Sequence, residues 1–202
     1  DRFGRASVLG IEPSVALTDT ARGLAGDRAN LEFRVGDGAA LGLGDGSADI
    51  AILHTVLSHV ADPASLVAEA TRILRPGGTL VVCDADFSKA ALGLCQGDPL
   101  DSCARAFVAG SVTDAWLAGK LKPLAFAAGL TVAHFGTANR VVTDGIGNLV
   151  WIRMASARLV GDGVIGQPLA DALEAEYMRR AEAGTLYGFL PFVTMIATKH
   201  AG

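Results

Sequence analysis

The sequence predicts an α/β protein whose mostly parallel sheet is flanked by helices. Three short β-rich runs, at residues 31–35, 49–53 and 78–84, carry this prediction, together with a helical pattern at 63–74 between the second and third runs. Two strands joined by a helix form a right-handed crossover, which makes the strands parallel. Ligands of such sheets bind beyond the carboxyl ends of the strands, so the polar residues there are the first site candidates. These residues are Asp37, Gly38, His54, Thr55 and Asp84.

The composition suits one globular domain, because half of the 202 residues are hydrophobic. A net charge of −4 gives no basic surface for nucleic acid or an anionic membrane. No apolar run approaches the ~20 residues that a membrane span requires. The three cysteines show no CxxC spacing and the four histidines are scattered, so we predict a reduced, cytoplasmic protein without a metal site.

An acidic residue follows the first apolar run. Residues 6–11 predict a strand that ends at Glu12, and Pro13 or Ser14 begins a helix to about Leu24. A carboxylate in that place accepts hydrogen bonds from both hydroxyls of a ribose. The alternative is that Glu12 caps the helix N-terminus, where the helix dipole favours an anion. The residues alone leave both interpretations open.

A glycine-rich turn follows the strand at 31–35. Its residues are Gly36, Asp37, Gly38 and Ala39. The Asp side chain can accept from an exocyclic amine, the neighbouring backbone N–H groups can bind ring nitrogens, and glycine lets the backbone approach a flat ring. An ordinary Asx turn is the alternative.

The next strand reads as a buried central strand. Residues 48–53 are nearly continuously apolar and end at His54. Asp62 is the expected N-cap of the following helix, with Pro63 at its first position. The sequence at 76–78, Pro-Gly-Gly, ends that helix and turns the chain into the next strand.

The pattern is looser beyond residue 85. We expect an interrupted strand at 130–135 and 140–143 and a long final strand at 186–198. Pro191 within the final strand indicates a sheet edge or a bulge. The expected helices lie at 99–117, 121–128, 148–159 and 167–183.

Four ordered motifs resemble a known family. They are GIEPS, GDGAAL followed by DGSADIAI, LHTVLSHVADP, and RILRPGGTLVV. The sequence resembles the class I, Rossmann-like S-adenosylmethionine-dependent methyltransferases, especially the small-molecule branch that includes ubiquinone/menaquinone biosynthesis and natural-product methyltransferases. The resemblance covers residues 8–84, whereas residues 85–202 match only in layout. It implies one methyltransferase-like domain over residues 1–202, with a Rossmann-like sheet and an antiparallel last strand.

The resemblance also implies a cofactor and the residues that bind it. The cofactor would be S-adenosyl-L-methionine and the product S-adenosyl-L-homocysteine. Glu12 would hold the ribose hydroxyls, and Pro13 would lie against the adenine. Asp37 would accept from the adenine amine, while Gly38 and Ala39 would line the ring through their backbone.

Histidines provide the candidates for proton transfer. Methyl transfer is a displacement at a sulfonium carbon that depends on positioning and on exclusion of water. An oxygen or nitrogen acceptor also needs a base that titrates near neutral pH. The resemblance places His54 beside the methionyl part of the cofactor, so His54 is our candidate base; the alternative is a cofactor contact that moves no proton. For His59 the alternative is a hydrogen bond at a helix start.

The sequence departs from the family at its beginning. The family's glycine-rich first motif, a strand followed by D/E-x-G-x-G-x-G, would precede Asp1 and is absent from this sequence, as are the first strand and its helix. A sheet that lacks this central strand is expected to expose two unpaired edges. We hypothesise that the sequence is part of a longer chain.

The acceptor is expected to bind to the regions that match least. Residues 85–118 and 144–184 are candidates for acceptor-binding or lid insertions. Aromatic and apolar side chains with one arginine would line a pocket there, although core packing is the alternative. The candidate residues are Phe107, Trp116, Trp151, Arg153, Met154 and Arg158. We expect a small, partly apolar acceptor, methylated on oxygen, nitrogen or carbon, and no nucleic-acid partner; the long last strand and exposed helices would allow a homodimer.

Other functions remain open at this point. A nicotinamide-dependent oxidoreductase also places an acidic residue after its second strand, but neither Tyr177 nor Tyr187 has a lysine four residues on. A non-methylating S-adenosylmethionine-binding protein and a degenerate partner subunit are the further alternatives.

Overall fold

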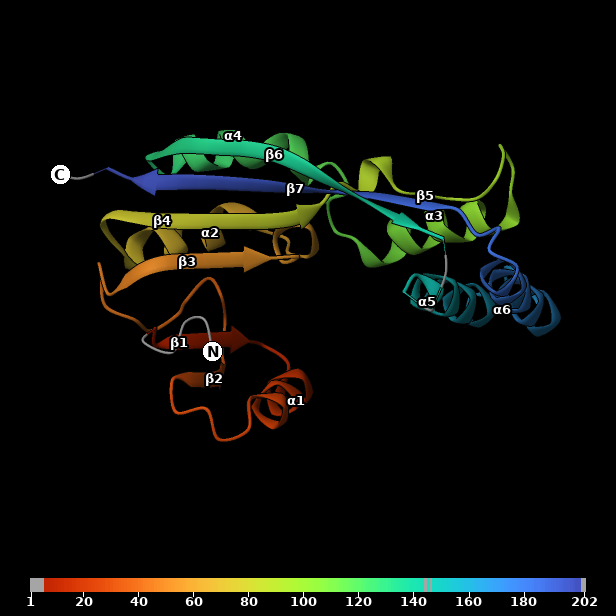
Figure 1. Ribbon diagram of the computed structural model, residues 1–202, viewed down its shortest axis with the longest axis horizontal. Helices are drawn as coiled ribbons and strands as arrows, with labels where there is room; N and C mark the ends of the chain where they lie inside the picture. Colours follow the sequence, from red (N-terminus) through yellow and green to blue (C-terminus); the bar gives the residue numbers. More distant parts are fainter. Residues whose placement is uncertain (1–5, 144, 146, 201–202) are drawn as a thin grey trace.

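The computed structural model describes residues 6–143, 145 and 147–200. Figure 1 shows the arrangement of the elements. The strands are β1 (Val8–Glu12), β2 (Leu31–Val35), β3 (Ala48–His54), β4 (Leu74–Ala85), β5 (Ala91–Leu92), β6 (Leu130–Val142) and β7 (Gly188–Lys199). The α-helices are α1 (Val15–Ala25), α2 (Pro63–Ile73), α3 (Pro99–Ser111), α4 (Leu117–Ala127), α5 (Leu149–Gly161) and α6 (Gln167–Glu182), and the short 3-10 helices are η1 (Leu57–His59) and η2 (Phe87–Lys89).

The strands form two sheets. β1 and β2 make a parallel pair, and the larger sheet has the order β3-β4-β7-β5, with β6 also paired to β7. β3 is parallel to β4, whereas β4, β5 and β6 are all antiparallel to β7. Only β7 therefore runs against the other strands of that sheet, so the predicted mostly parallel sheet with an antiparallel last strand is confirmed. Within the described residues, no strand pairs with the outer edge of β1 or of β3, and both edges are unpaired as expected.

Local signals fix the starts of the first two helices. The Ser14 hydroxyl accepts from the Leu17 N–H at 3.3 Å, and the Asp62 carboxylate accepts from the Ser65 N–H at 3.1 Å. Each bond satisfies a backbone donor that a helix N-terminus leaves without a partner. These caps place α1 directly after β1 and α2 shortly after β3, as the sequence predicted.

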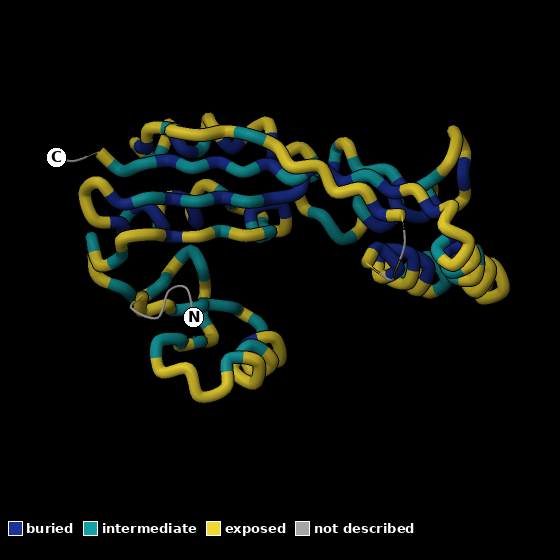
Figure 2. The backbone as a smooth tube through the Cα atoms, viewed as in Figure 1, coloured by how far each residue is buried: buried dark blue, intermediate teal, exposed yellow. Residues whose placement is uncertain are grey.

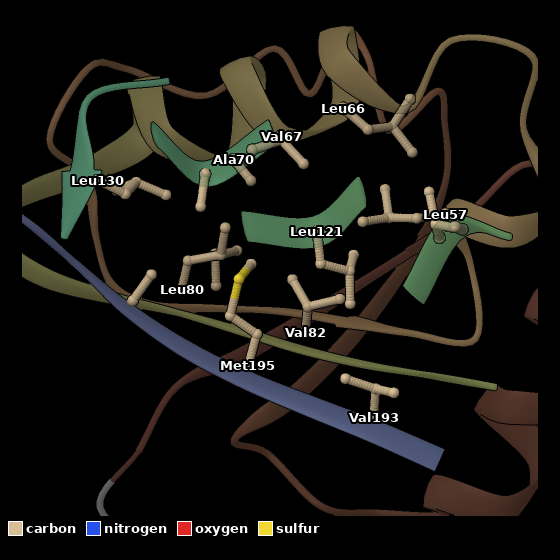
Figure 3. Packing of buried hydrophobic residues seen from close by; sticks show 14 of the residues in the cluster. Leu57, Leu66, Val67, Ala70, Leu80, Val82, Leu121, Leu130, Val193 and Met195 are labelled. Atoms are coloured by element: carbon tan, nitrogen blue, oxygen red, sulfur yellow. The ribbon is translucent and has the colours of Figure 1, made fainter. Parts of the chain in front are cut away.

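One hydrophobic core lies between the larger sheet and helices α2 and α4. Figure 3 shows Val67 and Ala70 of α2 and Leu121 of α4 facing Leu80 and Met195 of the sheet. Figure 2 shows that burial concentrates in β4, β7 and the segments packed on them, whereas the β1–α1–β2 unit is mostly exposed or half-buried. Burial alternates along β3, because Ala51 faces the core while Ile50 and Ile52 are 60% and 66% exposed on the opposite face. β3 is thus an edge strand within the described residues, and the prediction of a buried central strand is wrong.

A second core lies at the other end of β7, where α3, α5 and α6 pack together (Figure 1). Trp151 stacks on Phe107 with ring centroids 5.2 Å apart, and Tyr177 of α6 is fully buried. Leu190 brings β7 into this core, while Met195 brings the same strand into the first one. β7 is therefore shared by both cores.

β6 corrects one prediction. The strand expected to break between residues 135 and 140 is continuous, because β7 pairs with every residue of the weak stretch, including Gly136 with Thr194 and Ala138 with Phe192. Strand pairing outweighs the low β-propensity of that stretch.

Pro191 lies at a local sheet edge, as the sequence indicated. On one side of β7 the pairing with β4 stops at Phe192, and the pairing with β5 begins only at Phe189. The Pro191 carbonyl accepts from the Asp86 N–H at 2.9 Å on that side. Because no strand pairs with Pro191 on this side of β7, the missing N–H of proline costs no hydrogen bond between strands. The register shift between β6 and β7 lies elsewhere, between Val132 and His134.

The helix expected over residues 99–117 ends at Ser111 instead. The N–H groups of Thr113 and Asp114 both donate to the Ser58 carbonyl at 3.0 Å, which takes this segment away from helical hydrogen bonding. α4 then begins at Leu117 and contains Pro123. A contact with a residue more than fifty positions earlier in the chain therefore ends α3.

The loop that follows β2 is held by α2. Glu69 accepts from the Leu41 N–H and from Arg72, and Arg72 also donates to the Leu43 carbonyl at 2.8 Å. The hydrogen bonds from the Arg72 side chain and the Leu41 N–H lower the pKa of Glu69 from 4.5 to about 2. This loop contains Asp37 and Gly38, so the contacts also fix the approach to the candidate site.

Two structural absences apply to the part of the chain that is described. None of its helices is both long and apolar enough to cross a bilayer. No three of its histidine, cysteine, aspartate or glutamate side chains gather as a metal-binding group.

Leu80→Ala should destabilise the protein by about 2–5 kcal/mol, because it leaves a cavity in the first core. Leu80 is 0% exposed, whereas Leu24 is 79% exposed and serves as the matched control. Urea denaturation should show a clear loss for Leu80→Ala and a change within about 0.5 kcal/mol for Leu24→Ala. Equal midpoints for the two variants would contradict this assignment of the core.

Glu69→Gln should lower the stability in a pH-dependent way. A carboxylate whose pKa is depressed stabilises the folded state above its unfolded pKa, near 4.5, and loses that contribution as pH falls through the folded pKa of about 2. The difference in free energy of unfolding between wild type and variant should be constant above about pH 5 and shrink towards pH 2. Urea titrations at several pH values between about 2 and 7 measure this difference. A difference in free energy of unfolding that does not change with pH would refute the role given to Glu69.

Candidate functional site

The parallel pairing of β1 and β2 brings two predicted site residues to one edge. Glu12 is paired with Val35, so both strands end at the same level. Glu12 is the last residue of β1, and Asp37 follows β2 after one glycine. Because the strands are adjacent and parallel, their carboxyl ends and these two carboxylates lie on the same side of the small sheet.

Glu12 uses one of its oxygens locally. Oε1 accepts from the Ser14 N–H at 2.9 Å, next to the start of α1. Within the described residues, no donor reaches Oε2. Pro13 is exposed and Glu12 is half-buried. The helix-start alternative is therefore realised at one oxygen, and the second oxygen remains available to a ligand.

Asp37 shows the same division. Oδ1 accepts from the Ala39 N–H at 2.9 Å, which forms the Asx turn, and the Asp37 carbonyl accepts from the Ala40 N–H at 3.1 Å, which adds a backbone turn bond. Oδ2 has no donor among the described residues, and the side chain is exposed. A Cβ at Gly38 would lie 3.4 Å from the Leu66 side chain, which is an ordinary van der Waals distance, so α2 packs directly beside this turn. The turn holds one carboxylate oxygen and leaves the other free.

His54 ends β3 and is exposed. Its Nδ1 lies 3.0 Å from the Thr55 hydroxyl. Thr55 has φ +52°, the only positive φ at a non-glycine position in the described chain. This backbone conformation is strained for a β-branched residue, and such strain is concentrated at functional sites. The Thr55 N–H donates to the Cys83 carbonyl at 2.8 Å, so the larger sheet holds the strained residue.

His59 has a different environment. Nδ1 lies 3.1 Å from the Ser111 carbonyl, and its ring meets the edge of Phe87 with centroids 5.7 Å apart. Since a carbonyl only accepts, Nδ1 must carry the proton in this contact. His59 therefore ties the loop after β3 to the end of α3, which makes it a structural residue rather than our candidate base.

The residues expected to line an acceptor pocket are divided among several locations. Phe107 and Trp151 are buried in the second core. Arg153 pairs with Glu174, and Arg158 donates to the Ala106 carbonyl. Core packing and helix contacts thus explain these four. Met154 and Trp116 are exposed, and Trp116 lies beside the loop that follows β4.

Asp84 was predicted as a site candidate from its place after a strand, but its hydrogen-bond partner was not predicted. In the structure it is fully buried and binds Ser58, which the sequence analysis did not single out. The sequence offered one signal for this contact, an aspartate at the end of an apolar strand. A carboxylate buried in that place requires hydrogen-bond donors from nearby residues.

The comparisons with known proteins agree with this fold. Residues 1–82 match the family model described as a methyltransferase domain. An uncharacterised 37.1 kDa protein of a Streptomyces fradiae transposon is 45% identical over 80 residues, which is 40% of this chain and 23% of that protein. The ubiquinone/menaquinone biosynthesis C-methyltransferase of Roseobacter denitrificans is 32% identical over 83 residues, 41% of this chain and 33% of the relative. The chain thus spans a quarter to a third of these relatives.

A solved structure extends the likeness to the whole fold. The crystal structure of a Bacillus halodurans protein, provisionally assigned as a methyltransferase, matches with a TM-score of 0.64 at 19% identity, over 96% of this chain and 83% of that one. At this identity the match concerns the fold alone. Residues 1–82 therefore match a methyltransferase-domain family model, and the chain as a whole is similar in fold to this solved structure.

Proposed function

We propose that the protein transfers a methyl group from S-adenosylmethionine to a small, partly apolar molecule. One observation carries the proposal: Glu12 and Asp37 follow adjacent parallel strands, and each has one fixed and one open carboxylate oxygen. A ribose and an adenine amine are donors that suit two such acceptors. The family match of residues 1–82 supports the same cofactor.

The proposed binding roles follow the strand ends. The open oxygen of Glu12 would accept from the ribose hydroxyls, and that of Asp37 from the adenine amine. The backbone at Gly38 and Ala39 would line the ring, with the exposed Pro13 against its other side. The local bonds to Ser14 and Ala39 favour this site, because they fix both carboxylates before a ligand binds.

The chemistry proposed for the site is a direct displacement. The bound cofactor supplies a methyl group on a positively charged sulfur. The acceptor atom would form the new bond to the methyl carbon, and the electron pair of the broken carbon–sulfur bond would stay on sulfur, so that S-adenosylhomocysteine would leave as the product. His54 would take the proton from an oxygen or nitrogen acceptor. Because Nδ1 already contacts the Thr55 hydroxyl, Nε2 is the nitrogen that would receive it.

The acceptor side is proposed to lie beyond the ends of β3 and β4. Residues 85–118 and the described part of 144–184 would supply it as insertions of a single domain. The net charge of −4 supports a small molecule over a nucleic acid. The three free cysteines, Cys83, Cys95 and Cys103, support a reducing compartment, and we propose the cytoplasm.

Glu12→Ala and Asp37→Ala should each weaken binding of S-adenosylhomocysteine about tenfold to a hundredfold, because each removes a charge-assisted hydrogen bond of about 1.5–3 kcal/mol. Calorimetric titration measures this. Glu32→Gln is the matched control, since Glu32 is an exposed carboxylate on β2 that pairs with Arg34. Variants that bind as tightly as wild type would refute the assigned roles, and no binding by wild type would refute the cofactor site itself.

His54→Gln should lower the rate of methyl transfer to an oxygen or nitrogen acceptor about a hundredfold, because the variant has no group that can take the proton. A panel of phenols, amines and enolisable carbonyl compounds with isotope-labelled S-adenosylmethionine tests this. His134→Gln, at an exposed position of β6, is the control. An unchanged rate would show that His54 moves no proton. Binding without transfer to any acceptor would favour a non-methylating or partner-subunit function.

A further inference from the structure

Asp84 is a buried carboxylate at the carboxyl end of β4. It is 0% exposed, and its side chain accepts three hydrogen bonds. Oδ1 accepts from the Ser58 hydroxyl at 2.7 Å and from the Ala85 N–H at 2.9 Å, and Oδ2 accepts from the Ser58 N–H at 3.2 Å. No lysine, arginine or histidine in the described chain forms an ion pair with it. Two of the three donors come from one residue, so Asp84 chiefly holds Ser58.

Ser58 in turn binds the segment between α3 and α4. It is also 0% exposed, and its carbonyl accepts from the N–H groups of Thr113 and Asp114 at 3.0 Å. The adjacent His59 adds two contacts: its carbonyl accepts from the Thr113 hydroxyl, and its ring meets the Ser111 carbonyl. A single carboxylate therefore connects β4, the loop after β3 and the segment between α3 and α4.

The segment between α3 and α4 carries an exposed aromatic residue. Trp116 is 64% exposed, and Asp114 accepts from its N–H at 3.0 Å. The neighbouring Ala115 carbonyl accepts from the Ser88 N–H at 2.9 Å, and the Lys89 ammonium lies 4.5 Å from the centroid of the Trp116 ring. The loops after β3 and β4 and this segment thus meet at one place.

We propose that Asp84 is the positioning residue for the acceptor side of the site. By holding Ser58, it sets the place of the loop that begins at His54 and Thr55 and of the segment that carries Trp116. This inference rests on the proposed function, since it assigns these segments to the wall beside the reacting methyl group. Asp84 itself touches neither the cofactor nor the acceptor.

The arrangement requires a carboxylate rather than an amide. In Asp84→Asn, an amide NH₂ in the place of Oδ2 would face the Ser58 N–H, so two donors would meet. With the amide turned over, the NH₂ would face the Ala85 N–H instead. Either orientation leaves one buried backbone donor without an acceptor. Ser58→Ala, in contrast, keeps both backbone contacts of residue 58 and loses only the hydroxyl bond.

A purely structural role predicts a different pattern from a positioning role. If Asp84 only stabilised the fold, its loss would loosen β4 and β7 throughout. A positioning role predicts a local effect at the Thr113 and Asp114 amides, with the β7 amides of the core unchanged. Asp98 provides a control elsewhere in the fold, because it is also a buried aspartate that accepts backbone donors, from Leu94 and Leu100, although it additionally pairs with Arg180.

Hydrogen exchange of the whole protein tests the positioning directly. In Asp84→Asn the Thr113 and Asp114 amides should exchange about tenfold faster, while the amides of Met195 and Ala197 keep wild-type rates. Ser58→Ala should show a smaller effect at the same amides. Asp98→Asn should accelerate exchange in the second core, at Leu94 and Leu100, and leave the Thr113 and Asp114 amides unchanged. Unchanged exchange at Thr113 and Asp114, or uniform acceleration across β4 and β7, would overturn the proposal.

A functional measurement on the same variants separates this proposal from the proposed function. Asp84→Asn should bind S-adenosylhomocysteine with an affinity within about threefold of wild type, because Glu12 and Asp37 lie on other strands. Its rate of transfer to the acceptor that wild type methylates should fall at least about tenfold. An unchanged rate would overturn the positioning role. If wild type methylates nothing, the proposed function fails, and the exchange data still decide whether Asp84 holds the segment that carries Trp116.

Discussion

The antiparallel strand β7 is the constraint on which the larger sheet depends. It pairs with β4 on one side and with β6 along its whole length on the other, and it contributes Met195 to one core and Leu190 to the second. At its end, the Lys199 ammonium donates to the Thr71 and Leu74 carbonyls, where the last turn of α2 offers unsatisfied acceptors. β4 and β6 both run antiparallel to β7, and β3 runs parallel to β4, so β3, β4 and β6 share one direction. The loops that follow β3 and β4 therefore begin at the same edge of the sheet.

The candidate cofactor site is built from carboxylates that are only partly used by the protein. Glu12 and Asp37 each bind one nearby N–H, which restricts their rotamers without occupying the second oxygen. A side chain fixed in this way loses less entropy when a ligand binds. The hydrogen bonds from Glu69 and Arg72 to the loop after β2 also reduce the entropy lost on binding, since they fix the backbone near Gly38. Asp84 differs from both, because each of its two oxygens accepts from the protein.

Features that depend on neighbouring residues could be predicted from the sequence. The ends of β1, β2 and β3, the caps at Ser14 and Asp62, and the order of the elements up to β4 follow from periodicity, turn residues and motifs. Features that depend on distant residues could not. The end of α3 is set by the Ser58 carbonyl, and the continuity of β6 by β7. For the candidate site, the sequence predicted that Glu12 and Asp37 lie at strand ends, and the structure has them there, while their binding roles stay a prediction. The hydrogen bonds between Asp84 and Ser58 join residues far apart in the sequence, so they could not be predicted.

The most direct test of the central claim is a crystal structure of the protein with S-adenosylhomocysteine. We expect the adenosine at the carboxyl ends of β1 and β2, with a carboxylate oxygen of Glu12 on the ribose and one of Asp37 on the adenine amine. We also expect the sulfur on the side of His54. Electron density for the ligand at another place, such as between α5 and α6, would contradict the account, as would a ligand at these strand ends that touches neither carboxylate.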